Sequence, residues 1–262
     1  MLIDNGKKST LALTIEELEK FNIFKEKIIS LELLKTQGFN NISYLVKTVT
    51  NKYILKVFKS NESVNINRDF EYETLKKINR LNITSKPIFI NETFMIYEFI
   101  KGFHKTKLSS SEIKKLTLLI KKYHKIKPKI KYYDFRKDLK NYDSFLNDFK
   151  SNKLLNETSR TLNFIKKYKK ENVLTHHDLN SKNIIFNNKE IKIIDWEYVG
   201  INDIYFDLAS LCVEFGLNTK QQKQVLFYYF SVFKHDKNKK LKNFITLYKN
   251  LCELWFLKFT KI

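Results

Sequence analysis

The sequence predicts an α+β chain of two lobes, with an N-terminal antiparallel sheet lobe that carries one helix and a mainly helical C-terminal lobe. Three segments rich in strand-forming residues fall within the first 58 residues, and turn residues separate them. Beyond residue 100, apolar residues recur mostly at helical spacing. We therefore expect one lobe over residues 1–100 and a second over residues 101–262.

The elements of the first lobe follow in order along the chain. Strands are expected over residues 28–34, 42–49 and 53–58, where β-branched and aromatic residues dominate. Residues 69–78 form a helix candidate, because its apolar residues share one face. Residues 93–100 are expected to form the last strand of this lobe and the connection to the next.

The second lobe is expected to begin with a capped helix. Ser109 and Glu112 form a capping sequence in front of an amphipathic helix over residues 113–124. The half-apolar helical pattern continues at residues 145–149 and 161–168, which predicts further helices.

Composition places this chain among globular proteins. Of 262 residues, 43% are hydrophobic, including 22 Phe and 14 Tyr, which is enough for a sizeable core. The first eight residues do not resemble a signal peptide, and no apolar run approaches the roughly 18 residues of a membrane span. Two cysteines are too few for a disulfide framework, so we expect a cytoplasmic protein without a membrane span.

The formal net charge of +21 suggests a polyanionic partner, but its distribution argues against one. Only four of the 49 basic residues are Arg, and the Lys residues are dispersed along the chain. This pattern favours a solvated surface over a nucleic-acid interface, so no specific nucleic acid is expected. Weak, salt-sensitive binding of polyanions would be a side effect.

The chemistry-bearing part of the chain is residues 174–198. Asp178 and Asn183 lie five residues apart, as in the H-R-D-x-x-x-x-N loop of phosphoryl-transfer enzymes, and Asp195 follows twelve residues after Asn183. In this interpretation Asp178 orients a substrate hydroxyl and accepts its proton. Asn183 and Asp195 would supply hard oxygen ligands for Mg²⁺.

The residues around these three predict a compact arrangement. Residues 183–186 and 191–194 are short apolar strands, and an Asn-rich turn joins them, so a hairpin should return Asp195 to the side of Asn183. His176 is expected to hold the loop in shape. The alternative is that His176, His177 and Asp178 form a metal site.

Three motifs resemble the choline/ethanolamine kinases within the aminoglycoside-phosphotransferase-like group. They are His176-x-Asp178-x-x-x-x-Asn183, Ile194-Asp195-Trp196-Glu197-Tyr198, and Asn202-Asp203-x-x-Phe206-Asp207-Leu208-Ala209. The resemblance implies a protein-kinase-like fold, ATP as co-substrate with Mg²⁺, and a small cationic alcohol as the other partner. Glu197 would assist a second metal ion. Asp-Trp-Glu replaces D-F-G and no A-P-E segment follows, which argues against a protein substrate.

The resemblance also implies a set of nucleotide-binding residues in the first lobe. Lys56, on the third strand, corresponds to the lysine that reaches the phosphates, and Glu71 would pair with it in preference to Glu73. The turn that contains Gly38 lies where a phosphate-covering loop is expected, although it has a single glycine. Backbone groups near Glu98 and Phe99 would meet adenine.

On the substrate side, the resemblance implies that Glu214 lines a cation pocket. Trp255 matches the second of two Trp residues that form an aromatic cage, whereas Cys252 replaces the first, which leaves selectivity for choline open. Tyr205 could supply the missing aromatic surface. Asp207 is expected to brace the catalytic loop.

These observations predict an ATP-dependent kinase that phosphorylates the hydroxyl of choline or ethanolamine. Aminoglycosides, amino sugars and thiamine remain alternative acceptors. A catalytically silent kinase-like protein and a polyanion-binding protein remain alternatives of another class, and the sequence leaves the oligomeric state open.

Overall fold

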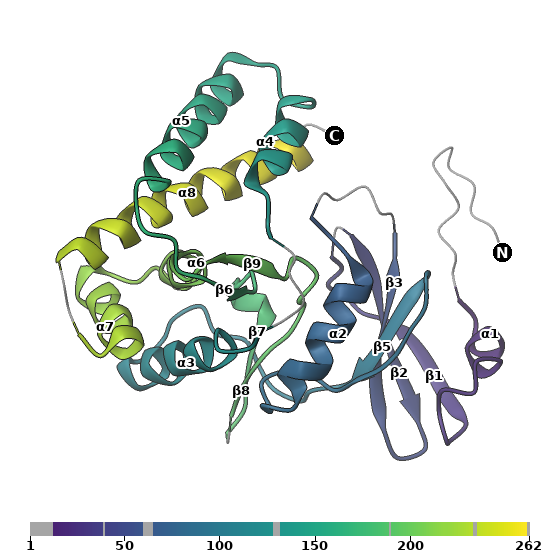
Figure 1. Cartoon of the computed structure of the whole chain (residues 1–262). Helices are drawn as coiled ribbons and strands as arrows, with labels where there is room; N and C mark the ends of the chain where they lie inside the picture. Colours follow the sequence, from purple (N-terminus) through teal and green to yellow (C-terminus); the bar gives the residue numbers. More distant parts are fainter. Residues whose placement is uncertain are drawn as a thin grey trace. The chain divides into compact units, whose positions relative to one another are not determined.

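The computed structural model describes residues 13–38, 40–59, 65–127, 132–188, 190–232 and 235–260 (Figure 1). Residues 1–8, which do not resemble a signal peptide in sequence, lie outside these ranges. Residue contacts divide the chain into two compact units, Met1–Ser63 with Ser85–Ile100, and Val64–Thr84 with Lys101–Ile262.

The first unit contains the predicted antiparallel sheet, which is confirmed with a strand order of β1-β2-β3-β5-β4. Each pair of neighbouring strands is antiparallel. The sequence did not reveal β4, a short edge strand that begins with a proline. The strand bounds are β1 Ile28–Leu33, β2 Asn41–Thr48, β3 Lys52–Phe58, β4 Pro87–Ile90 and β5 Phe94–Glu98.

A short helix, α1 (Ile15–Glu19), precedes the sheet and contributes to the same core. Thr14 and Glu17 form a capping box that fixes its first turn. Leu18 packs with Val46, Leu55 and other buried residues of the strands. Val57, Phe94 and Ile96 of β3 and β5 belong to the same buried cluster.

The second unit begins with α2 (Arg68–Asn79), which Asn67 caps by accepting from the Phe70 N–H at 2.8 Å. The sequence placed this helix in the lobe of residues 1–100, whereas the contacts group it with the second unit. The residues that follow it explain the difference, because the Ile193 N–H donates to the Ile83 carbonyl at 2.8 Å. The domain limits at residue 100 stay a prediction.

The helix α3 (Ser110–Tyr123) begins as predicted. Ser109 accepts from the Glu112 N–H, and the Glu112 carboxylate accepts from the Ser109 N–H, which completes the capping box. The helix expected over residues 145–149 was wrong, because residues 145–148 connect α4 (Phe135–Asp143) to α5 (Phe149–Ile165) and Asp148 caps the new helix. The helix expected over residues 161–168 is present as far as Ile165, as the last part of α5.

Two small antiparallel sheets carry the chemistry-bearing segment. The strand β6 (Asn172–Thr175) pairs with β9 (Gly200–Asp203), and β7 (Ile184–Phe186) pairs with β8 (Ile191–Ile193). The predicted hairpin at β7 and β8 is therefore present. Gly102 lies against it so closely that a Cβ there would collide with the Phe186 carbonyl and with the Ile185 side chain.

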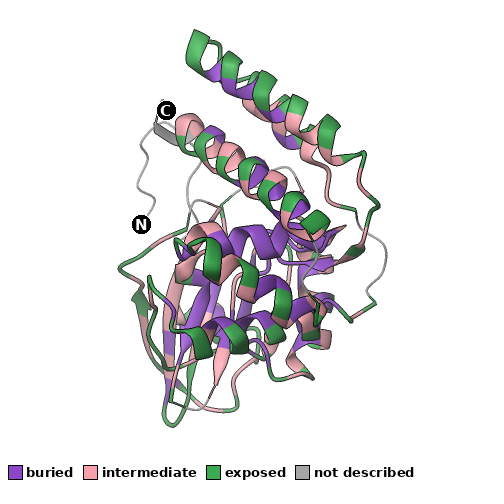
Figure 2. Cartoon of the chain, turned by 90° about the vertical axis from the view of Figure 1, so that its left-hand side faces the viewer, coloured by how far each residue is buried: buried purple, intermediate pink, exposed green. Residues whose placement is uncertain are grey.

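Three helices complete the second unit: α6 (Tyr205–Glu214), α7 (Thr219–Phe230) and α8 (His235–Thr260). Eight of the ten residues of α6 are buried, and α8 packs against both α6 and α5. Figure 2 shows α5 and α8 as long helices on which exposed residues alternate with buried ones. The apolar α6 therefore forms the core on which the chemistry-bearing loops are built. None of the helices in the described ranges is long and apolar enough to cross a membrane.

Candidate active site

The loop that carries Asp178 is shaped by side-chain amides. It leaves β6, passes through Asp178 and enters the short helix η1 (Ser181–Asn183). The Asn180 side chain accepts from the Lys182 and Asn183 N–H groups, while its own amide donates to Asp178 Oδ1 at 2.9 Å. Asn180 thus caps η1 and orients Asp178 at once, a contribution that the sequence analysis missed.

Asn183 lies directly against Asp178, as the five-residue spacing suggested. Its side-chain nitrogen donates to Asp178 Oδ2 at 2.8 Å and to the Asp178 carbonyl at 2.9 Å. These bonds commit the nitrogen of the amide to Asp178. The amide oxygen therefore points the other way, as a metal ligand at this position would require.

The hairpin brings Asp195 back to this loop. The Ile194 N–H donates to the Asn183 carbonyl at 2.9 Å, so the residue before Asp195 is fixed beside η1. Asp195 has a φ of 61°, a left-handed conformation that non-glycine residues seldom adopt. Such conformations cost free energy and recur at functional sites, where the surrounding contacts maintain them.

His176 ties the two segments together. Its Nδ1 accepts from the Asp178 N–H at 3.1 Å, and its Nε2 lies 2.9 Å from the Ile194 carbonyl. A neutral imidazole with the proton on Nε2 satisfies both contacts, so His176 holds the loop through its backbone partners. The indole of Trp196 packs edge-on against the same ring.

His177 and Asp178 do not share a metal site with His176. The His177 ring stacks on Tyr133 with the ring centroids 3.8 Å apart, and its Nε2 lies 3.0 Å from the Asn202 amide nitrogen. Within the described ranges, no group of three or more His, Cys, Asp or Glu side chains could hold a metal ion.

Asp207, at the start of α6, is the buried anchor of the loop. Its carboxylate accepts from the His176 N–H at 2.9 Å and from the His177 N–H at 3.1 Å. The Tyr123 hydroxyl donates to it at 2.5 Å, and His124 Nε2 lies 3.1 Å away. Burial opposes the charge, but the contact with His124 outweighs it and holds the pKa of Asp207 at about 2.

The electrostatics of Asp178 differ from those of Asp207. Burial, followed by the negative charge of Asp195, raises the pKa of Asp178 to about 7, although the bond from Asn180 opposes the shift. A carboxyl group with this pKa can exchange a proton near neutral pH. A cation placed between Asp178 and Asp195 would lower the pKa of Asp178 and favour its ionised form.

The donor set fits a hard divalent cation. The Asn183 amide oxygen and the carboxylates of Asp195 and Glu197 are all oxygen ligands, which Mg²⁺ prefers. So few protein ligands are typical of a Mg²⁺ site that is completed by water and phosphate oxygens. The bonds to Asp178 fix the orientation of the Asn183 side chain.

Glu197 and Glu71 meet at an arginine that the sequence analysis missed. Arg68 Nη1 lies 3.1 Å from Glu197 Oε2 and 2.8 Å from Glu71 Oε2. Burial opposes the charge of Arg68, but the two carboxylates outweigh it and raise its pKa. Two signals could have pointed to Arg68, since it is one of four arginines and lies three residues before Glu71 on a helix.

Glu214, which the sequence assigned to a cation pocket, lies in the same region as Asp178. Glu214, at the end of α6, accepts from the Tyr248 hydroxyl at 2.9 Å, and burial raises its pKa. The charges of Glu214 and Asp178 both act on Tyr248 and Cys252, so these four groups share one region. Burial raises the pKa of the Cys252 thiol to about 12, which keeps it neutral.

The two predicted aromatic residues lie in different surroundings. Trp255 is half-buried on α8, one helical turn beyond Cys252 and therefore on the same face. The Tyr205 ring is 1% exposed and packs against Phe230 and Phe244, with Lys240 Nζ 4.5 Å from the ring centroid. The structure thus places the side chain of Tyr205, the first residue of α6, in the core.

A further buried acid lies on α4. Asp138 accepts from the Asn65 amide at 3.0 Å and interacts with the Tyr133 hydroxyl. Burial raises its pKa to about 7. Asn65 also donates to the Asp134 carbonyl at 3.2 Å, so this cluster joins the chain before α2 to the start of α4.

The predicted nucleotide-binding residues of the first unit lie on or beside its sheet. Lys56 is 3% exposed on β3, between Ser43 of β2 and Met95 of β5. A Cβ at Gly38 would meet no atom within 4 Å, so the turn there is open. The pairing of Lys56 with Glu71 stays a prediction.

The backbone at the end of β5 is already hydrogen-bonded within the first unit. The Glu98 N–H donates to the Lys86 carbonyl and the Phe99 N–H to the Lys52 carbonyl, each at 3.0 Å. The Glu98 carbonyl accepts from the Ser85 hydroxyl. An adenine ring that used any of these groups would have to share or displace the existing partner.

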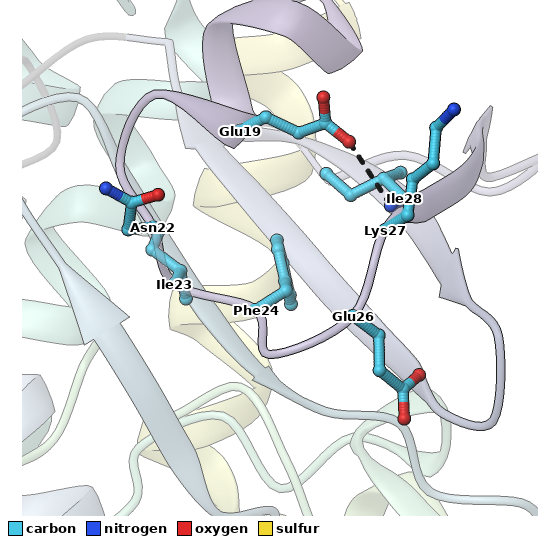
Figure 3. Close-up of a pocket in the computed structure, with 7 residues that line it drawn as sticks. All are labelled: Glu19, Asn22, Ile23, Phe24, Glu26, Lys27 and Ile28. Carbon is cyan, nitrogen blue, oxygen red and sulfur yellow. Dashed lines mark hydrogen bonds between the residues drawn. The ribbon is translucent and has the colours of Figure 1, made fainter.

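A small pocket in the first unit contains none of the predicted site residues. It lies where the chain passes from α1 to β1, and Glu19 there accepts from the Ile28 N–H at 3.4 Å (Figure 3). Glu26, also in its lining, accepts from Thr48 and Thr50, which ties it to the turn between β2 and β3. These contacts explain the acids of this pocket by local structure.

Comparison with known proteins agrees with the fold and the site motifs. The sequence model of the choline/ethanolamine kinase family matches residues 28–251. The protein LicA homolog of Mycoplasma capricolum subsp. capricolum is 23% identical over 223 residues, which cover 81% of this chain and 86% of the relative.

Two solved structures share the architecture. The choline kinase LicA from Streptococcus pneumoniae superposes with a TM-score of 0.77 at 22% identity, covering 94% of this chain and 91% of that chain. The streptomycin–ATP ternary complex of APH(2")-IIa gives a TM-score of 0.67 at 20% identity, covering 94% and 97%. At these identities the likeness shows the fold, and it confirms the predicted protein-kinase-like class. Because the family model spans most of its length, the chain belongs to the choline/ethanolamine kinase family.

Proposed function

We propose that this chain transfers the γ-phosphoryl group of ATP to the hydroxyl of a small cationic alcohol, choline or ethanolamine. The observation that carries the proposal is the pair of bonds from Asn183 to Asp178, together with the return of Asp195 to the same loop. Family membership supports a small-molecule phosphotransferase. The choice of acceptor rests on the surroundings of Asp178.

In the proposed reaction, Asp178 accepts a hydrogen bond from the acceptor hydroxyl and takes its proton as the oxygen attacks the γ-phosphorus. The bond from the γ-phosphorus to the bridging oxygen breaks, and ADP leaves. Asn180 and Asn183 fix the two carboxylate oxygens of Asp178, so the base does not need to reorient.

Mg²⁺ would be held by Asn183, Asp195 and Glu197. When it is bound, it neutralises the charge of the phosphates. Lys56 would contact the phosphates, with Glu71 as its partner. Gly38 would lie in the loop near the phosphates, and the backbone of Glu98 and Phe99 would lie near adenine. His176 and Asp207 would hold the catalytic loop.

The acceptor ammonium would be held by the Glu214 carboxylate and by the face of Trp255. Glu214 is half-buried with a raised pKa, and among the described residues its hydrogen bonds come from Tyr248 and the Ser181 backbone, so an ammonium group that arrives there would stabilise its charge. A methylated ammonium depends on aromatic faces, and Cys252 provides none. The site should therefore bind a primary ammonium, which depends on hydrogen bonds, as tightly as a methylated one. Tyr205 would act by supporting α6 from the core.

The test is an assay of ADP release with Mg²⁺–ATP against choline, ethanolamine, thiamine and an aminoglycoside panel. Turnover with choline or ethanolamine that Asp178→Ala abolishes is the expected result. Turnover with only thiamine or an aminoglycoside would contradict the proposed acceptor but would support the proposed phosphoryl transfer. ATP binding without turnover on any acceptor would favour a silent kinase-like protein.

A further inference from the structure

Arg68 lies at the start of α2, where it contacts one acid on the same helix and one from a distant part of the sequence. Its Nη1 contacts Glu71 on the same helix at 2.8 Å and Glu197, which follows Asp195 by two residues, at 3.1 Å. The three side chains are 10%, 2% and 7% exposed, respectively. The contact therefore operates with little screening by solvent.

The charges of this cluster do not cancel. Two carboxylates and one guanidinium leave a formal charge of −1 on the three side chains. The guanidinium contacts both carboxylates and so reduces their mutual repulsion.

The contact with Arg68 also restricts the orientation of the Glu197 side chain. One guanidinium nitrogen is shared between two carboxylates, and it contacts Oε2 of Glu71 and Oε2 of Glu197. Residues that hold a metal ligand from behind commonly change metal affinity by 10- to 100-fold. Arg68 stands in that relationship to Glu197.

We propose that Arg68 is a positioning residue that keeps Glu197 oriented for the divalent cation beside Asp195. The inference rests on the proposed function, because it assumes that Glu197 meets a metal ion. It adds a residue on α2, 129 positions away in sequence, to the control of that ion. The salt bridge itself is not a ligand and does not touch substrate.

The experiment measures the binding of Mn²⁺ in the presence of ADP by electron paramagnetic resonance of free Mn²⁺, without any acceptor. The variants are Arg68→Met, Arg68→Lys, Glu197→Gln and the Arg68→Met/Glu197→Gln double variant. Arg80→Met is the matched control, because Arg80 is exposed at the end of the same helix. Circular dichroism establishes that each variant is folded.

We expect Arg68→Met to weaken Mn²⁺ binding at least about tenfold and Arg68→Lys to weaken it by about three- to fivefold, since one ammonium cannot reproduce the planar contact. In the Glu197→Gln background, Arg68→Met should change the affinity by less than about twofold, because its target is gone. Arg80→Met should leave the affinity unchanged.

The inference is overturned if folded Arg68→Met binds Mn²⁺ within about twofold of the unmodified protein, or if its effect persists in full without Glu197. If Arg68→Met does not fold, Arg68→Lys decides, and an unchanged affinity in that variant overturns the inference. Absence of Mn²⁺–ADP binding by the unmodified protein would instead overturn the proposed function, and the inference with it.

Discussion

Asn183 donates to Asp178 at two points, to Oδ2 at 2.8 Å and to the backbone carbonyl at 2.9 Å. The amide thereby locks the proposed base and leaves its own oxygen for a cation. A single residue type satisfies both demands, because only a carboxamide of this length offers a donor and an acceptor on opposite sides.

Replacement of Asn183 by Asp should expose this double role. The new carboxylate keeps an oxygen ligand but loses the donor, and it faces Asp178 as a like charge. We expect kcat to fall about 100-fold and the acid limb of the pH profile to move to higher pH. Rates of ADP release between pH 6 and 9 provide the measurement, and an unchanged rate would contradict the assignment.

The pH dependence of the unmodified enzyme should follow Asp178. Its pKa of about 7 lies above the ordinary value, a bound cation would lower it, and the base must be ionised, so kcat/KM should rise with pH and level off at or below about pH 7. Asn180→Ser keeps an oxygen to cap η1 but removes the amide that lowers this pKa. The acid limb of this variant should therefore move upward, which a profile of kcat/KM measures. A shift to lower pH would argue against Asp178 as the base.

Glu214 should affect the acceptor and not the nucleotide. We expect Glu214→Gln to raise KM for choline or ethanolamine about tenfold and to leave KM for ATP within about twofold, because the loss of a charge-assisted contact costs roughly 1.5 kcal/mol. Glu253→Gln is the control, since Glu253 is exposed on α8 and pairs with Lys150. Equal effects of the two variants on acceptor KM would remove Glu214 from the pocket.

Asp207 should be a major determinant of stability. Asp207→Asn removes a buried charge that accepts four hydrogen bonds, and we expect the free energy of unfolding to fall by about 3 kcal/mol at pH 7. Because its folded pKa of about 2 is depressed, this contribution is complete above pH 4 and lost as the pH falls toward 2. The difference in Tm between the two proteins should therefore shrink below pH 4. Exposed Asp236, mutated to Asn, should have little effect.

Asp138 should behave in the opposite way. Its folded pKa of about 7 is raised, so the folded protein binds the extra proton and stability falls as the pH rises from about 4 to 7. Asp138→Asn keeps an acceptor for Asn65 and should raise Tm at pH 8 while leaving it nearly unchanged at pH 4. Thermal unfolding at both pH values measures this, and a lower Tm of the variant at pH 8 would contradict it.

The sequence by itself determined the elements whose reasons are local. The capping box of Ser109 and Glu112 and the hairpin that returns Asp195 toward Asn183 depend on residues close together in the chain, and both were predicted. The proximity of Asp178 and Asn183 was also predicted, since only a short loop separates them in the chain. The segments rich in β-branched and aromatic residues also predicted the strands β1, β2 and β3 of the antiparallel sheet.

Only the tertiary structure revealed the contacts that join distant segments. The bond from Arg68 to Glu197 spans 129 positions, and neither residue's neighbours indicate it. Asp207 reaches Tyr123 and the backbone of His176 for the same reason. Tyr205 shows the converse, because its place in the core is decided by Phe230 and Phe244, which no local pattern connects to it. Side-chain packing and buried charge depend on which elements meet, and spacing along one segment cannot specify that.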